Sequence, residues 1–192
     1  MLVTLEGIDG SGKTTIISAL QEVYPDAVYT LEPTDSWYGE AVQKSIKTTT
    51  ADPLAELFLY MADHAYHLQT TIIPALTDGK LVISDRYIDS RYAYQSASLD
   101  GILKDPLSYI EQIHQPWTIL PNLTLYFDLS PELGAKRSGS TNKFEQVSFL
   151  KKVHDSYEQV ISKHPDRFVR IDATLPPADM AQLAIKSISN SL

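Results

Sequence analysis

The sequence predicts an α/β fold of three layers, in which a five-stranded parallel sheet carries helices on both faces. Short apolar segments rich in β-branched residues alternate along the chain with longer segments of helical periodicity. A glycine-rich stretch directly follows the first apolar segment, and no internal repeat or linker divides the 192 residues. Strands that alternate with helices need crossover connections, and these favour parallel pairing with helices on both faces of the sheet.

The expected elements follow in order along the chain. Strands are expected at residues 2–6, 27–31, 81–85, 123–129 and 167–172. Helices are expected from the glycine-rich stretch to about residue 24, at 52–76, near 144–163 and at about 177–190. Asp52 and Pro53 supply an N-cap and a first-turn proline for the second helix. We expect residues 1–192 to form one domain that binds ligands at the carboxyl ends of its strands.

Composition and charge argue against several classes of function. The net charge is −8, from 16 basic and 24 acidic residues, so nucleic acid is not an expected partner, because affinity for a polyanion depends on neutralising phosphates. The absence of cysteine excludes disulfides and thiolate metal sites. Neither a signal peptide nor a run of about 18 apolar residues is present, so we expect a cytoplasmic location and no membrane partner.

Residues 7–15, GIDGSGKTT, match the phosphate-binding pattern G-x-x-x-x-G-K-[ST] between an expected strand and an expected helix. In a P-loop of this kind, backbone N–H groups surround the phosphates of a nucleoside triphosphate. Lys13 is expected to reach the β- and γ-phosphates, and the Thr14 hydroxyl to ligate Mg²⁺. The residues expected to contact ATP here are Gly7, Ile8, Asp9, Gly10, Ser11, Gly12, Lys13, Thr14 and Thr15.

A second polar segment, SDRYIDSRYAYQ at residues 84–95, follows the third expected strand. Asp85 stands where the end of a parallel strand would offer a carboxylate to the Mg²⁺ shell. Arg86, beside it, is able to bridge two phosphates. This segment is therefore our candidate for the part of the site that receives the phosphoryl group, next to the P-loop.

Several segments, taken in order, resemble the thymidylate kinase family. They are GIDGSGKTT, the EP after the second strand, LYMADHAYH at 59–67, the DRY and AYQ of the second polar segment, and PNLTLYFDL at 121–129. The resemblance covers nearly the whole chain. It implies a P-loop NTPase fold, transfer of the γ-phosphoryl group of ATP to dTMP, a requirement for Mg²⁺, and a homodimer.

The resemblance also implies roles for single side chains. Asp9 would orient the sugar and phosphate of the acceptor, Tyr60 would stack on thymine, and Tyr94 would close against the 2′ carbon. Lys13 and Arg86 would stabilise the transferred group. The further contacts that it implies are Glu32, Pro33, Ser90 and Gln95 for the acceptor, and the backbone around Ala173 for adenine.

The sequence departs from the family at the base site and at the acceptor phosphate. His64 stands where the family usually has an arginine that binds a thymine carbonyl, and Arg91 stands where a smaller polar residue is common. We therefore predict that Arg91 supplies the guanidinium that His64 lacks. No arginine adjoins Glu32 and Pro33, so Arg86 is expected to hold more of the acceptor phosphate.

Residues 134–146 resemble the lid of the family, because they are small, polar and basic. The P-loop has no basic residue before Lys13. A lid cation is therefore expected to reach the transferred phosphoryl group, and either Arg137 or Lys143 is the candidate.

Three other functions stay open. A deoxynucleoside kinase would use Glu32 as a general base toward a sugar hydroxyl, a role that the spacing from Glu32 to Trp37 permits. Another nucleoside monophosphate kinase would share the P-loop. A nucleotide sensor would bind ATP without turnover, although the presence of Asp85 and Arg86 favours an enzyme.

Overall fold

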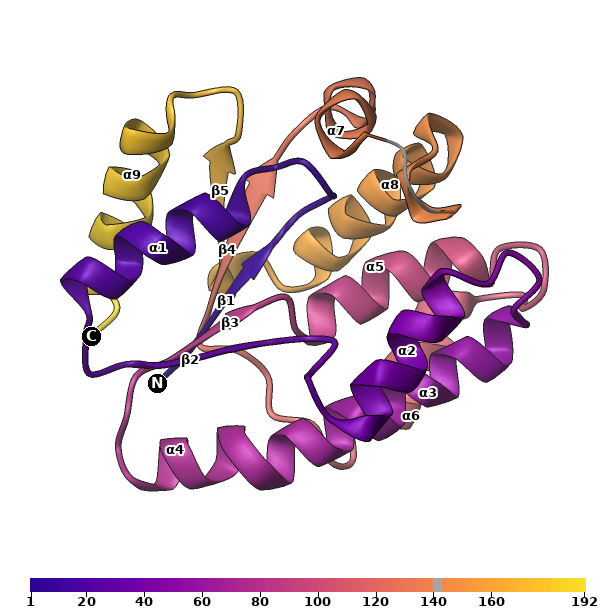
Figure 1. Cartoon of the computed structure of the whole chain (residues 1–192), viewed down its shortest axis with the longest axis horizontal. Coiled ribbons are helices and arrows are strands. Elements are labelled where there is room, and N and C mark those ends of the chain that lie inside the picture. Colours follow the sequence, from indigo (N-terminus) through magenta and orange to yellow (C-terminus); the bar gives the residue numbers. More distant parts are fainter. Residues whose placement is uncertain (140–142) are drawn as a thin grey trace.

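The computed structural model describes residues 1–139 and 143–192, and of residue 143 the backbone alone. The strands are β1 (Leu2–Glu6), β2 (Val28–Leu31), β3 (Val82–Asp85), β4 (Leu123–Asp128) and β5 (Phe168–Asp172). They form one sheet in the order β2-β3-β1-β4-β5, and every neighbouring pair is parallel (Figure 1). The predicted fold class is confirmed.

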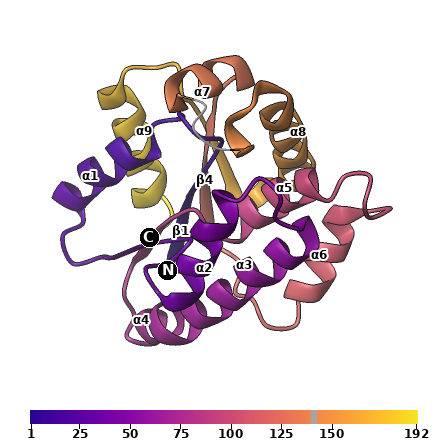
Figure 2. The same ribbon diagram turned by 45° about the vertical axis from the view of Figure 1, so that its right-hand side comes forward.

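Helices cover both faces of this sheet. They are α1 (Lys13–Val23), α2 (Trp37–Ile46), α3 (Pro53–His67), α4 (Ile73–Thr77), α5 (Ile88–Ser98), α6 (Pro106–His114), α7 (Pro131–Ser138), α8 (Val147–Lys163) and α9 (Pro177–Ser189). Helices α1 and α9 lie together on one side, and α5 and α8 lie on the other (Figures 1 and 2). Short 3-10 turns occupy Lys143–Glu145 and Pro165–Arg167.

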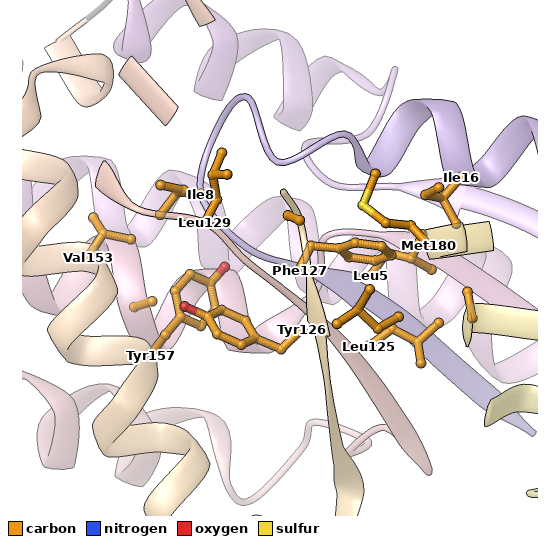
Figure 3. Close-up of a cluster of buried hydrophobic side chains, with 14 of the residues drawn as sticks. Leu5, Ile8, Ile16, Leu125, Tyr126, Phe127, Leu129, Val153, Tyr157 and Met180 are labelled. Atoms are coloured by element: carbon orange, nitrogen blue, oxygen red, sulfur yellow. The ribbon is translucent and has the colours of Figure 1, made fainter. Parts of the chain in front are cut away.

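The alternation of side chains along the strands builds a core on each face. Phe127 of β4 points toward Met180 of α9, whereas its neighbour Tyr126 points toward Tyr157 of α8 (Figure 3). The rings of Tyr126 and Tyr157 lie 5.0 Å apart between centroids. Because both faces of the central strands are buried, β1 and β4 have almost continuous apolar sequences.

The observed strands agree with the predicted ones to within one residue at each end. The helix expected at 52–76 begins as predicted, since the Asp52 carboxylate accepts from the N–H of Ala55 at 2.8 Å. It is interrupted by a π-helical stretch, Leu68–Ile72, immediately before α4. Pro74 follows that stretch, and its nitrogen has no hydrogen to donate to the preceding turn.

The sequence did not predict α2, α5, α6 and α7 as helices. Within the residues that the structure covers, no helix is both long enough and apolar enough to span a membrane.

Candidate functional site

The glycine-rich stretch forms a tight loop from the end of β1 to the start of α1. Gly7, Gly10 and Gly12 have φ angles of 140°, 83° and 91°, a region that side chains with a Cβ rarely adopt. A Cβ on Gly7 would lie 2.5 Å from the carbonyl oxygen of Phe127. The loop therefore lies directly on β4, and glycine is required for this approach.

The ammonium group of Lys13 is held inside the curve of this loop. Its Nζ donates to the carbonyl oxygens of Gly7 and Ile8 and to Oγ of Ser11, each at 3.1 Å. Burial, and then the charge of Arg86, lower the pKa of Lys13 to about 8. A positive charge in this position is stabilised by an incoming anion, as expected of a phosphate site.

A cavity of about 560 Å³ opens beside the loop, at the carboxyl ends of β1, β2 and β3. This volume is in the range of small-molecule sites. The predicted site residues that line it are Asp9, Gly10, Gly12, Lys13, Thr14, Thr15, Glu32, Pro33, Tyr60, Asp85, Arg86, Ser90, Arg91, Tyr94, Gln95 and Arg137.

Arg86 is fixed at the boundary between the loop and the rest of the cavity. Its φ of 63° lies in the left-handed region, which costs about 1–2 kcal/mol for a residue other than glycine. Nη1 donates to the carbonyl oxygen of Gly7 at 2.9 Å and to Ser90 Oγ at 3.0 Å. Nη2 donates to the Asp9 carboxylate at 2.5 Å and to the Tyr94 hydroxyl at 3.3 Å. The strained backbone directs the guanidinium to the P-loop and to the hydroxyls of α5.

Oxygen ligands for a divalent cation occur in the same cavity. Asp85 Oδ1 is a buried atom with no hydrogen-bond partner among residues 1–139 and 143–192. Thr14 lines the cavity and is exposed. A free carboxylate oxygen and a hydroxyl are the donor types that Mg²⁺ prefers, so these residues fit the predicted metal.

Glu32 lies at the centre of a buried cluster of hydrogen-bond donors. Its Oε1 accepts from Nδ1 of His64 at 2.7 Å and from Nδ1 of His67 at 2.8 Å, and its Oε2 is paired with Nη2 of Arg91. Burial alone would raise the pKa of Glu32, but the charge of Arg91 and the hydrogen bonds from His64 and His67 hold it well below its ordinary value. The carboxylate is ionised and fully engaged.

His64 lies behind Glu32 rather than on the wall of the cavity. Because an ionised carboxylate only accepts, Nδ1 of His64 carries the hydrogen. Burial lowers the pKa of the ring, so the ring is neutral at pH 7 and Nε2 accepts from the Thr118 hydroxyl at 2.8 Å. Both ring nitrogens are thus occupied by protein groups, and the structure does not place His64 in contact with the cavity.

Arg91 does line the cavity. Its guanidinium lies over the ring of Tyr60, with 4.7 Å from Cζ to the ring centroid. Its Nε has no hydrogen-bond partner within the described part of the chain, and the same is true of Gln95 Nε2 one helical turn later. Both residues line the cavity, and each keeps one buried nitrogen donor without a partner among the described residues.

The family model described as thymidylate kinase matches residues 5–184. The chain belongs to the thymidylate kinase family. A protein of Natronomonas pharaonis named probable thymidylate kinase is 52% identical over 100% of this chain and 99% of its own length. Those of Halorubrum lacusprofundi and Halobacterium salinarum, with the same name, are 59% and 54% identical over 92% and 100% of this chain, and over 91% and 97% of their own lengths.

Several residues expected of a thymidylate kinase lie beside the cavity rather than on it. Gly7, Ile8 and Ser11 belong to the loop itself, where the first two offer their carbonyl oxygens to Lys13. Ala173 is buried, and its carbonyl oxygen accepts from Arg137 Nη1 at 2.9 Å. The side chain of Lys143 lies outside the described residues, so of the two lid candidates only Arg137 is placed in the cavity.

Sequence reasoning missed two groups that support the site. One is His67, which shares Glu32 with His64. The other is Glu6, fully buried at the end of β1, with Tyr157 of α8 donating to it. A carboxylate inside the apolar segment LVTLE was the visible signal for Glu6, because an acidic residue is seldom fully buried unless it is paired.

Proposed function

We propose that the chain transfers the γ-phosphoryl group of ATP to the 5′-phosphate of dTMP, which gives ADP and dTDP. Membership of the thymidylate kinase family supports the reaction. The roles that we assign to single residues rest on one observation. The P-loop, Tyr60 of α3, and Arg91 and Gln95 of α5 all line the same cavity. One cavity thus offers both a triphosphate site and an acceptor site.

On the donor side, Lys13 and the loop amides hold the phosphates of ATP, and Arg137 supports the transferred group from α7. Asp85 and Thr14 would hold Mg²⁺. When bound, the ion would neutralise part of the negative charge of the phosphates. The backbone around Ala173 stays our candidate for adenine, and residues 134–146 stay our candidate lid on a single domain.

On the acceptor side, the reaction depends on the charge of the acceptor phosphate and on its position relative to ATP. The second pKa of a phosphate monoester is about 6, so dTMP is mostly a dianion at pH 7 and needs no strong base. One of its oxygens attacks the γ-phosphorus while the bond to the β-phosphate oxygen breaks. Arg86 lowers the repulsion between the two anions. Arg86 and Lys13 also lower the pKa of Asp9, against the effect of burial, so Asp9 is ionised and able to orient the sugar.

The base of dTMP occupies the end of the cavity that holds Tyr60, Arg91 and Gln95. Tyr60 would stack on the ring, and Arg91 and Gln95, which line the cavity and each keep a nitrogen donor unpaired within the described chain, would bind its carbonyl oxygens. Tyr94 closes against the sugar, and Ser90 supports Arg86. His64 contributes through Glu32 rather than by contact.

The geometry disfavours Glu32 as the base of a deoxynucleoside kinase. The two oxygens of Glu32 accept from two histidines and one arginine, and its pKa is held well below the ordinary value. A general base is most effective when its pKa lies near the working pH.

We also propose that the enzyme is a homodimer that acts in the cytoplasm, where its nucleotide substrates are made. Large apolar side chains are exposed on α2 and α3. Trp37 is 72% exposed, Phe58 49% and Tyr66 42%.

The testing experiment measures ADP release from Mg-ATP with dTMP, dUMP, AMP, CMP and thymidine, in the wild type and in Glu32→Gln. We expect fast turnover with dTMP, none with thymidine, and continued dTMP turnover in Glu32→Gln. Thymidine turnover that disappears in Glu32→Gln would instead identify a deoxynucleoside kinase. ATP binding without turnover of any acceptor would identify a sensor.

A further inference from the structure

Glu6, the last residue of β1, is a fully buried carboxylate to which the proposed mechanism assigns no role. Its Oε1 accepts from the backbone N–H of Tyr87 at 2.8 Å. Its Oε2 accepts from the hydroxyls of Ser90 at 2.5 Å and of Tyr157 at 2.9 Å. Both hydroxyl hydrogens are therefore directed to Glu6.

The oxygens of these hydroxyls are then free to accept, and each accepts from a group of the phosphate site. Ser90 Oγ accepts from Nη1 of Arg86 at 3.0 Å. The Tyr157 oxygen accepts from the backbone N–H of Gly7 at 3.4 Å. Since an ionised carboxylate has no hydrogen to donate, Glu6 determines which way both hydroxyls point.

We propose that Glu6 is a positioning residue for phosphoryl transfer. Through the hydroxyls of Ser90 and Tyr157 it holds the guanidinium of Arg86 and the first amide of the P-loop in place. This inference rests on the proposed function for its kinetic consequence. Its structural consequence, the orientation of the Gly7 amide and the Arg86 guanidinium, is independent of which acceptor the enzyme uses.

The charge state of Glu6 decides whether this arrangement holds. Glu6 faces Arg86 and Asp89 near the start of α5, Tyr157 of α8 and Lys13 of α1. Asp89 is itself paired with both Nη atoms of Arg167 at 2.6 Å. Burial, and then the charge of Asp89, raise the pKa of Glu6 to about 7. Below this pH a protonated Glu6 donates to one of the two hydroxyls, whose hydrogen then turns away from Glu6 toward the other hydroxyl, 3.0 Å away, and Glu6 no longer presents a negative charge to Arg86.

The test compares Glu6→Gln with Asp63→Asn. Gln has the shape of Glu6 but presents N–H groups to the two hydroxyls. Asp63 is a matched control, because its buried carboxylate also accepts from one backbone N–H and two hydroxyls, those of Thr34 and Ser36. It does not reach Arg86.

Activity with dTMP is measured from pH 6 to 8.5 at saturating substrates. We expect kcat of the wild type to rise with a midpoint near pH 7, and kcat of Glu6→Gln to be at least tenfold lower without this rise. Asp63→Asn is expected to retain the rise. The titration of the dTMP phosphate is present in every variant and cancels in the comparison. A Glu6→Gln profile equal to that of the wild type overturns the proposal.

A second readout needs no turnover. The amide signal of Gly7 and the guanidinium signals of Arg86 are followed by NMR against pH in the wild type and in both variants. We expect them to shift with a midpoint near pH 7 in the wild type and in Asp63→Asn. In Glu6→Gln this step should be missing, which leaves only the shift from Lys13 near pH 8 that all three proteins share. Identical titrations in all three proteins reject the role of Glu6, even if dTMP proves not to be the acceptor. If the NMR signals shift as expected but the enzyme does not turn over dTMP, only the proposed function is rejected.

Discussion

At the scale of single residues, the exchange of His64 and Arg91 shows how a buried charge is placed. Arg91 reaches the cavity only because Glu32 neutralises it, and Glu32 is held in turn by His64 and His67. A guanidinium that is 2% exposed needs such a partner, because an unpaired buried charge is very costly. His64 therefore helps to hold Arg91 in place through Glu32, and it does not itself contact the cavity.

Arg91→Ala should raise the KM for dTMP about tenfold or more, because hydrogen bonds to a charged group contribute about 1.5–3 kcal/mol. The kcat should change much less, since the role proposed for Arg91 is at the base and not at the transferred group. Steady-state kinetics with varied dTMP measures both. Arg170→Ala is the control, because Arg170 is likewise an ion-paired arginine, held by Asp128 and Glu158, but lies away from the cavity. An unchanged KM in Arg91→Ala would contradict the assignment.

At the scale of elements, α2 depends on one close approach of backbone to backbone. Ser36 caps this helix, with its Oγ accepting from the N–H of Gly39 at 3.2 Å. A Cβ on Gly39 would lie 1.8 Å from the carbonyl oxygen of Thr34. The turn that leads from Glu32 and Pro33 into α2 is therefore compatible only with glycine at position 39.

Gly39→Ala should lower the free energy of unfolding by about 1–3 kcal/mol, the usual cost of overpacking. It should also raise the KM for dTMP, because the displaced turn carries one wall of the cavity. Gly101→Ala is the control for KM: its φ of 80° makes alanine costly in stability as well, but nothing lies within 4 Å of the added Cβ and Gly101 does not line the cavity. Urea unfolding and steady-state kinetics check both variants. A normal KM in Gly39→Ala would mean that the turn does not shape the acceptor site.

At the scale of the whole molecule, the site reduces the stability of the fold. Lys13 is buried and charged at neutral pH, although its pKa falls to about 8 in the folded protein from 10.5. Between these two values the unfolded chain keeps a proton that the folded chain has lost. The free energy of unfolding therefore rises with pH between these two values. Below pH 8 the full destabilisation caused by burying the charged Lys13 is present.

The free energy of unfolding of the wild type should accordingly increase relative to that of Lys13→Met as the pH goes from 7.5 to 9.5. Urea unfolding of both proteins without nucleotide, at three or four pH values, measures the difference. Subtracting the variant removes the contribution of other titrating groups. A constant difference would show that Lys13 is not destabilised by burial. Lys13→Met should also abolish turnover.

The exposed apolar side chains of α2 and α3 also act at the scale of the whole molecule. If these helices form the interface of the proposed homodimer, Phe58→Glu should convert the protein to a monomer, because it would bury a charge at the interface. Sedimentation velocity of both proteins checks this. Glu22→Ala, on α1, serves as a control for a change of surface charge. A wild-type monomer at micromolar concentration would contradict the proposal.

The sequence by itself determined where the five strands lie along the chain and where the phosphate loop lies. Both are local: a strand buried on two faces is visible as an apolar run, and the loop is one continuous motif. It also indicated most residues that line the cavity. Helix α5 was not predicted, because residues 88–97 are buried on every side and the helix shows no apolar stripe.

Only the tertiary structure decided how these residues act on one another. The sequence could not show that Glu32 joins two histidines and Arg91, or that Glu6 meets Ser90 and Tyr157 across 84 and 151 positions. Hydrogen bonds and pKa shifts depend on distance and burial, which are set by packing and not by neighbours along the chain. For that reason the residue types at the site were predictable, whereas the partner and charge state of each one were not.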